Sequence, residues 1–226
     1  MSNETRWPAI AGQLSTNPLF KGLEANDIAA MLPCLHAYIR SYAPGQAVID
    51  QAQDIHAIGI VLSGEATASH TDVSGQRLVL AHHGAGSIFG DVLSANRTQR
   101  SPVMILADTA MNVLYVPYDR VLTRCERGCN RHDNVLRNLL DIISGKYFAL
   151  HERIGYLMLP SLRDKIVSYL EACAEKAGSP TFQIPFDRTE MADYLNADRS
   201  ALSRELGRLK KEGRIDYYKN SFKLLN

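Results

Sequence analysis

The sequence lacks a long hydrophobic run, a cysteine framework and an excess of charge of one sign. No apolar stretch in its 226 residues approaches the ~20 residues that span a bilayer, so we expect no membrane partner. The N-terminus also lacks the basic-then-apolar pattern of a signal peptide. Its four cysteines are too scattered for a secreted disulfide framework. These absences favour a cytoplasmic protein with reduced thiols.

Motifs of the common catalytic machineries are missing as well. The chain contains no nucleophile elbow, no Walker loop and no Ser-His-Asp order. A jelly-roll metalloenzyme needs histidines at H-x-H spacing, whereas His82 and His83 are adjacent. We therefore expect a binding protein and not an enzyme.

Charge is distributed unevenly, although the chain as a whole carries only +1. The last 28 residues hold eight basic and three acidic side chains, so they carry +5 and the rest of the chain −4. A basic end is typical of a nucleic-acid-binding domain, and the alternative is a solvated helix end followed by a tail.

Three segments follow one another along the chain, and together they predict an α+β fold. Residues 1–124 contain short β-type runs separated by turn signals such as Pro44-Gly45 and Ser63-Gly64, which predicts a β-roll of the double-stranded jelly-roll type. The effector-sensing role of this roll is implied only by the family resemblance given below. Residues 125–160 are expected to form a long dimerisation helix and hinge. Residues 161–226 are expected to form a small DNA-binding domain.

The long helix is predicted from about His132 to Leu159, and Pro160 is expected to break it and act as a hinge. Leu139, Ile142 and Ala149 form one apolar stripe, suited to packing on the roll of the same chain. A second stripe follows alternating steps of four and three residues, which is typical of a coiled-coil seam with a second copy. The alternative is a helix that lies only on its own domain. The predicted seam consists of Leu136, Leu140, Ile143, Tyr147, Leu150, Ile154 and Leu157.

The C-terminal segment has the order of a winged helix-turn-helix. A helix ending near Gly178 is followed by a second helix with an Asp187/Glu190 capping box, and Asn196 suits the turn. The third helix, opened by Asp198, buries a stripe of leucines, and a hairpin around Lys219-Asn220 follows. Its polar face and the wing supply the candidate DNA contacts, which are Arg199, Ser200, Ser203, Arg204, Arg208 and Lys219.

Two local motifs in this order resemble the Crp–Fnr family of bacterial transcription regulators. The stretch DRSALSRELGRLKKEG resembles the recognition helix of the family, and GSIFGDVLSANRTQRSPV, residues 86–103, resembles its phosphate-binding cassette. The resemblance implies DNA contacts from Arg199, Ser200, Ser203 and Arg204. It also implies a homodimer, a pseudo-palindromic operator, RNA polymerase as a further partner, and a small-molecule effector.

The residues of the cassette are chemically suited to bind an anion. Gly90 allows close approach of a ligand, a helical turn from Asp91 offers free N–H groups, and Arg100 with Ser101 can bind a phosphate. Relatives that bind cyclic AMP carry glutamate in place of Asp91 and two hydroxyl residues on the long helix, where this chain has Leu150 and His151. A cyclic nucleotide is thus a candidate effector, and these departures argue against cyclic AMP itself. An ordinary roll segment with Arg100 in an ion pair is the alternative.

The sequence gives weaker support for other kinds of sensor. An iron–sulfur cluster of the Fnr type is not expected, because no cysteine precedes Cys34. Cys125 and Cys129 with His132 form a weak metal-binding pattern, so we predict no metal site. Either His82 or His83 could ligate haem in a gas or redox sensor of the same family. A ligand-binding interaction module without DNA is the last alternative, and the basic winged helix argues against it.

Overall fold

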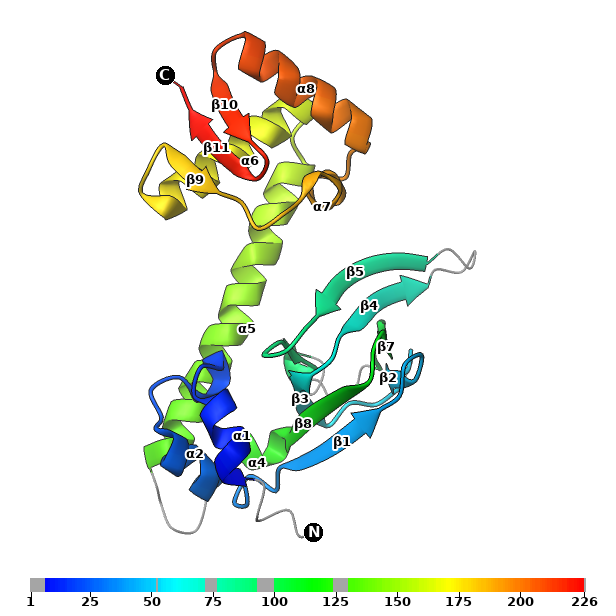
Figure 1. Cartoon of the computed structure of the whole chain (residues 1–226), viewed down its shortest axis with the longest axis vertical. Coiled ribbons are helices and arrows are strands. Elements are labelled where there is room, and N and C mark those ends of the chain that lie inside the picture. Colours follow the sequence, from blue (N-terminus) through cyan, green and yellow to red (C-terminus); the bar gives the residue numbers. More distant parts are fainter. Residues whose placement is uncertain (1–6, 52, 72–76, 93–99, 124–129, 226) are drawn as a thin grey trace. The chain divides into compact units, whose positions relative to one another are not determined.

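The computed structural model describes residues 7–51, 53–71, 77–92, 100–123 and 130–225 (Figure 1). The chain divides into two compact units, Met1–Ser144 and Gly145–Asn226. One helix, α5 (Asn130–Leu157), begins in the first unit and ends in the second. None of the described helices is both long and apolar enough to span a membrane.

The described residues of the N-terminal unit form two four-stranded antiparallel sheets, which confirms the predicted roll. One sheet has the order β1-β8-β3-β6 and the other β2-β7-β4-β5. Their strands are β1 (Tyr38–Tyr42), β2 (Ala47–Ile49), β3 (Ala57–Ser63), β4 (Ala66–Thr71), β5 (Arg77–His83), β6 (Ile88–Phe89), β7 (Met104–Ala107) and β8 (Met111–Pro117).

Strand β8 shows why the first sheet is buried on both faces. Val113 and Tyr115 point into the core between the sheets, whereas Leu114 and Val116 contact a separate helical core. That second core contains α1 (Trp7–Leu14), the short helix η2 (Pro18–Phe20), α2 (Ala25–Met31) and α4 (Tyr118–Leu122). The nearly continuous apolar run of β8 thus follows from its central place in the sheet.

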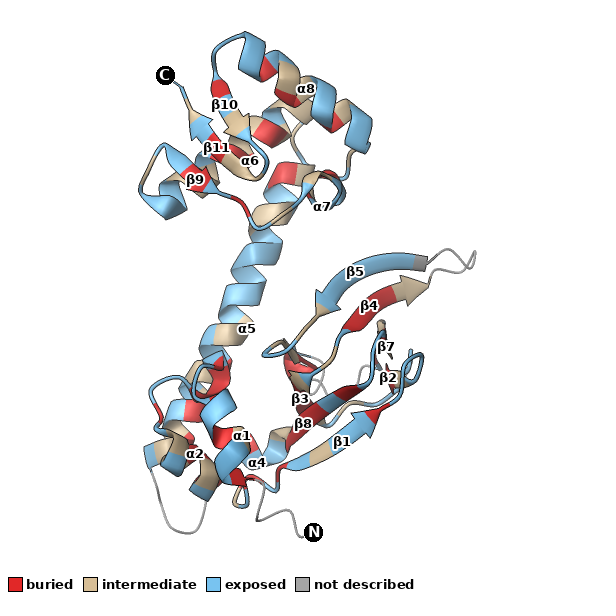
Figure 2. Ribbon diagram, viewed as in Figure 1, coloured by how far each residue is buried: buried red, intermediate tan, exposed pale blue. Residues whose placement is uncertain are grey.

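The first turns of α5 belong to the same helical core. Val135 and Leu139 are buried there, and Ile142 and Ile143 pack against it. Ala149, predicted to continue this stripe, is exposed instead, and it lies beyond Ser144, where the first unit ends. Every residue from Ser144 to His151 is exposed, as Figure 2 shows in pale blue.

The C-terminal unit is a three-helix domain with a small sheet, in the predicted order. It comprises α6 (Leu162–Ala177), β9 (Thr181–Gln183), α7 (Arg188–Tyr194), α8 (Arg199–Lys211), β10 (Ile215–Tyr218) and β11 (Ser221–Leu224), with the sheet order β10-β11-β9. The predicted caps are present: Asp187 and Glu190 form a capping box, Gly178 ends α6, and Asn196 has φ 48°.

The last two turns of α5 pack on this domain. Tyr156 is buried in its core beside Tyr169 and Tyr194. Arg153 donates from Nε to the Tyr194 carbonyl and from Nη2 to the Asp193 carbonyl, each at 3.1 Å. The end of α5 is therefore fixed to α7 before the chain reaches Pro160, where the predicted helix break is found between Leu157 and Leu162.

Candidate nucleic-acid interface and effector cassette

Helix α8 has the two faces expected from its sequence. Leu202, Leu206 and Leu209 are fully buried in the C-terminal core. The opposite face exposes four polar side chains, Arg199, Ser200, Ser203 and Arg204. Asp198 caps the helix by accepting from the Ala201 N–H at 2.9 Å. The leucines thus anchor the helix, and its polar face is left to solvent.

A hydrogen-bond chain orders part of that polar face. The Ser200 hydroxyl donates to the Asp198 carboxylate at 2.5 Å and accepts from Arg204 Nη1 at 3.1 Å. The hydroxyl of Ser200 is also the main cause that lowers the pKa of Asp198 below its usual range. Ser203 donates to the Arg199 carbonyl one turn earlier, at 2.9 Å. The Ser200 hydroxyl therefore orients the Arg204 guanidinium, whereas the Ser203 hydroxyl is already hydrogen-bonded to the backbone.

Arg208 is less free than its neighbours because it pairs with Glu205 at 3.0 Å, one turn earlier. Glu205 also accepts from Arg163 of α6, whose guanidinium in addition binds Glu212 at the end of α8. Sequence reasoning missed Arg163, since its partners lie 42 and 49 residues away. These ion pairs hold α8 on α6.

The wing is the hairpin of β10 and β11, with Lys219 at its turn in the left-handed region (φ 51°). Arg188, the first residue of α7, donates to the Lys219 carbonyl at 2.6 Å. The Arg188 guanidinium also lies 5.0 Å from the Tyr217 ring centre and 4.9 Å from that of Phe222. Sequence reasoning missed Arg188 as well. It fixes the wing turn to α7, with the Lys219 ammonium exposed near Tyr218.

In the cassette, two of the predicted residues serve the roll itself. Gly90 has φ 73°, and a Cβ there would lie 2.9 Å from the Ala57 carbonyl oxygen. Ser101 is buried, and its hydroxyl donates to the Val103 carbonyl and accepts from the Val103 N–H. Glycine is thus required at position 90 by the fold alone.

The charged cassette residues differ in exposure. Asp91 is buried and begins a helical turn with Val92, whereas the Arg100 side chain is 70% exposed. Arg100 Nε lies 3.9 Å from the Asp54 carboxylate, and the Ser101 N–H donates to the Gln53 carbonyl. Residues 93–99 of the cassette lie outside the described residues. The Arg100 guanidinium is therefore an exposed cation, and it lies next to the segment 53–54, which is hydrogen-bonded to Ser101.

The predicted seam on α5 is largely open to solvent in a single chain. Leu140, Tyr147, Leu150 and Ile154 are 46–61% exposed, and Leu136, Ile143 and Leu157 are half-buried. Ile143 also contacts the helical core of its own unit. The His151 ring stacks on Tyr147, with ring centres 6.2 Å apart.

The two adjacent histidines of β5 have different surroundings. His82 Nδ1 lies 3.1 Å from the Thr67 hydroxyl, which donates to Asp108. The His83 ring lies 5.7 Å from Phe89. Cys125 and Cys129 fall outside the described residues. Within the described ranges, no group of three or more His, Cys, Asp or Glu side chains is placed to hold a metal ion.

Comparison with known proteins matches both units to domain families. Residues 39–127 match the cyclic nucleotide-binding domain, and residues 164–226 match the Crp-like helix-turn-helix domain. The chain belongs to the Crp/Fnr family of transcription regulators. The resemblance inferred from the two sequence motifs is thereby confirmed.

Two curated Crp/Fnr relatives illustrate the breadth of the family. The transcriptional activator protein FnrL of Cereibacter sphaeroides is 28% identical over 187 residues, which are 79% of this chain and 72% of FnrL. The cyclic AMP receptor protein of Thermus thermophilus is 25% identical over 198 residues, 87% of each protein.

Solved structures support the fold. The structure of CprK in complex with OCPA has a TM-score of 0.63 and 16% identity, covering 87% of this chain and 91% of that protein. The two domain matches show that this Crp/Fnr protein is a DNA-binding transcription regulator with an effector-binding domain.

Proposed function

We propose that the chain works as a homodimer that binds a pseudo-palindromic operator through the polar face of α8. The observation that carries the proposal is the contrast within this helix, whose leucines are fully buried while Arg199 and Arg204 are exposed. Double-stranded DNA, a second copy and RNA polymerase are the proposed partners, and the proposed compartment is the cytoplasm. The role is binding and regulation, without a catalytic step.

Within this interface the side chains take different roles. Arg204, supported by Ser200, is suited to donate two parallel bonds to guanine O6 and N7. Ser200 acts through Arg204, and Ser203 permits close approach of the helix. Lys219 and Arg208 add positive charge for phosphate contacts, which favour all sequences alike.

The dimer is proposed to form along the seam of α5. Leu140, Tyr147, Leu150 and Ile154 are exposed apolar side chains at a and d positions of the heptad, which suits self-association of two identical helices. Members of this family are dimers, which supports a second copy as the occupant.

The seam is tested by the double variant Leu140→Glu with Ile154→Glu. We expect monomers, because four carboxylates would have to be buried unpaired between two helices. Analytical ultracentrifugation at micromolar concentration measures the mass. The control is Asn134→Glu with Gly155→Glu, which adds the same charge at exposed positions of α5 that are not part of the seam. A dimeric seam variant would rule out this interface.

For the effector we propose a small phosphate-bearing compound on the cassette, held by Arg100. Support comes from the exposure of Arg100 and its single long contact with Asp54 among the described residues. Cyclic AMP is disfavoured, since Leu150 and His151 lack the two hydroxyls found in relatives that bind it.

Calorimetric titration with cyclic nucleotides and small phosphates tests this assignment. Arg100→Leu should weaken binding roughly tenfold or more through loss of a charge-assisted contact. Arg137→Leu, on exposed α5, is the matched control. If no phosphate compound binds, or if Arg100→Leu binds normally, the cassette is an ordinary segment of the roll.

A further inference from the structure

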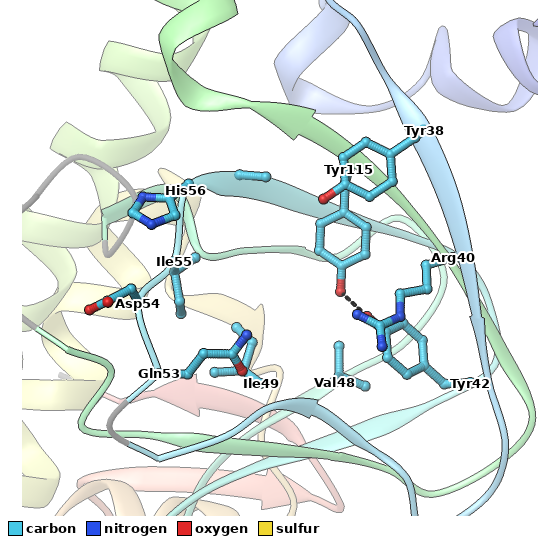
Figure 3. A pocket seen from close by; sticks show the side chains of 11 residues that line it. Tyr38, Arg40, Tyr42, Val48, Ile49, Gln53, Asp54, Ile55, His56 and Tyr115 are labelled. Atoms are coloured by element: carbon cyan, nitrogen blue, oxygen red, sulfur yellow. Dashed lines mark hydrogen bonds between the residues drawn. The ribbon is translucent and has the colours of Figure 1, made fainter.

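The roll contains a cavity of about 220 Å³ that the proposed function does not use (Figure 3). Tyr38, Arg40 and Tyr42 of β1 line it together with Tyr115 of β8 and the segment 53–57. We call it the tyrosine pocket. All of its lining residues belong to the N-terminal unit.

Two buried hydroxyls meet in this pocket. The Tyr42 and Tyr115 hydroxyl oxygens are 2.6 Å apart, and the two residues are 3% and 8% exposed. One hydroxyl donates to the other, so the accepting hydroxyl keeps a proton of its own to donate. Among the described residues neither hydroxyl has a second hydrogen-bond partner, and buried polar groups are normally satisfied. The pair therefore offers one buried O–H donor.

The Tyr115 hydroxyl remains protonated at neutral pH. Burial, with the hydrogen bond to Tyr42, raises the pKa of Tyr115 far above its usual range. Burial likewise raises the pKa of Tyr38. Tyr38 and Tyr115 thus present hydrogen-bond donors and no phenolate charge to the pocket.

Arg40 adds a cation next to this donor. Its guanidinium carbon lies 5.1 Å from the centre of the Tyr42 ring, and it forms no hydrogen bond or ion pair within the described part of the chain. Asp54, the carboxylate of the lining, lies instead within 3.9 Å of Arg100. Arg40 is accordingly available to an anion from outside the chain.

The rest of the lining is mixed, because Gln53, Asp54 and His56 contribute polar side chains beside an aromatic and aliphatic wall. The Tyr38 ring is stacked on Tyr115, with centres 5.3 Å apart, and Val48, Ile49 and Ile55 contribute aliphatic surface. A volume of about 220 Å³ is below the ~300–1,000 Å³ of pockets for drug-sized ligands, so the ligand must be small.

We propose that the tyrosine pocket binds a small planar organic carboxylate. Its carboxylate accepts from Arg40 and from the spare proton of the Tyr42–Tyr115 pair, and its flat body lies against the tyrosine rings and the aliphatic wall. None of the cassette residues 86–103 lines this pocket, and the two sites use different cations, Arg40 and Arg100. It would give the regulator a second ligand besides the one bound at the cassette.

Benzoate is the probe, with benzamide as the uncharged compound of the same shape. Calorimetry on the full-length protein should show benzoate binding more tightly than benzamide. Arg40→Met should weaken benzoate binding about tenfold or more, and Tyr115→Phe should weaken it several-fold, as expected for lost hydrogen bonds to a charged ligand. Arg137→Met is the matched control and should leave binding unchanged.

The position of the probe is read from tyrosine ring resonances by nuclear magnetic resonance. Benzoate should shift the rings of Tyr38, Tyr42 and Tyr115 and leave Tyr218 on the wing unmoved. Melting temperatures establish that each variant is folded, and Tyr42→Phe serves in place of Tyr115→Phe if the latter unfolds. Equal affinity for benzoate and benzamide, no response to Arg40→Met, or shifts elsewhere would each overturn the proposal.

Discussion

At the scale of single residues, the polar face of α8, which we propose binds DNA, is ordered by its own hydrogen bonds. The Asp198 carboxylate holds the Ser200 hydroxyl, and that hydroxyl holds one nitrogen of Arg204. A guanidinium that is already oriented loses less side-chain freedom on binding. Under the proposed function, Ser200 acts on recognition through Arg204 and not through a base contact of its own.

This arrangement predicts a graded effect of two substitutions. Arg204→Ala should cost about 1–3 kcal/mol on the best operator and little on random DNA, because a base contact is lost. Ser200→Ala should cost less, and the double variant should match Arg204→Ala alone, since the serine acts through the arginine. Fluorescence anisotropy on both DNAs measures these differences.

Lys219→Ala is the control for this prediction. A phosphate contact from the wing should weaken specific and random DNA alike and flatten the salt dependence. Equal losses on both DNAs for Arg204→Ala would instead place that arginine on the phosphates.

Local residue roles were predictable, whereas partners distant in the sequence were not. The caps Asp198 and Asp187, the left-handed Asn196 and the turn at Lys219 follow from short-range backbone chemistry. Arg163 and Arg188 have partners 31 to 49 residues away, and no local sequence pattern indicates these contacts. The Tyr42–Tyr115 pair, 73 residues apart, needed the β1–β8 register.

At the scale of elements, α8 depends on α6 for its position. Arg163 lowers the pKa of Glu212 through a side-chain hydrogen bond, and Asp216 is held below its usual pKa by Lys210. A carboxylate whose pKa is lowered in the folded state stabilises the fold above its unfolded pKa. That stabilisation is lost as the pH falls through the folded pKa.

Acid should therefore destabilise the C-terminal unit in a way that Arg163 controls. Below about pH 4.5, the ordinary pKa of Glu212, the melting temperature should fall, and in Arg163→Met the fall should be smaller because one lowered pKa is restored. Circular dichroism melts between pH 6 and pH 3.5 measure this. Since these groups are exposed, high salt should reduce the difference. An unchanged pH dependence in Arg163→Met would contradict it.

Helix α5 shows where sequence periodicity succeeds and where it stops. The heptad correctly predicted a long helix, and its start at Asn130 and end at Leu157 lie two residues from the expected positions. The stripe of Leu139, Ile142 and Ala149 was wrong at Ala149, because periodicity says which face of a helix is apolar and not where the N-terminal unit ends. The seam itself stays a prediction.

At the scale of the whole molecule, the two-fold symmetry of the proposed dimer sets the geometry of its operator. The two α8 helices of a dimer should read half-sites about one turn of DNA (~34 Å) apart. Inserting five base pairs between the half-sites turns one to the opposite side, so affinity should fall towards that of a single half-site. Anisotropy with the two spacings measures this.

A control operator keeps the spacing and changes only the central sequence. It should bind within a few-fold of the original, because only the shape of the spacer is altered. Equal affinity for the lengthened operator would mean that the two DNA-binding units are not held at a fixed separation.

The segment 53–57 lies between the tyrosine pocket and the cassette and contacts both. It lines the tyrosine pocket, and it also contacts the cassette. The Gln53 carbonyl accepts a hydrogen bond from the Ser101 N–H, and Asp54 lies near Arg100. Gly90 packs against the Ala57 carbonyl. Two ligands that share a wall cannot bind independently if either one shifts it. By linkage, each then changes the affinity of the other by the same factor. Such a protein would report the joint presence of two metabolites, and its operator occupancy would follow their combination and not the level of one.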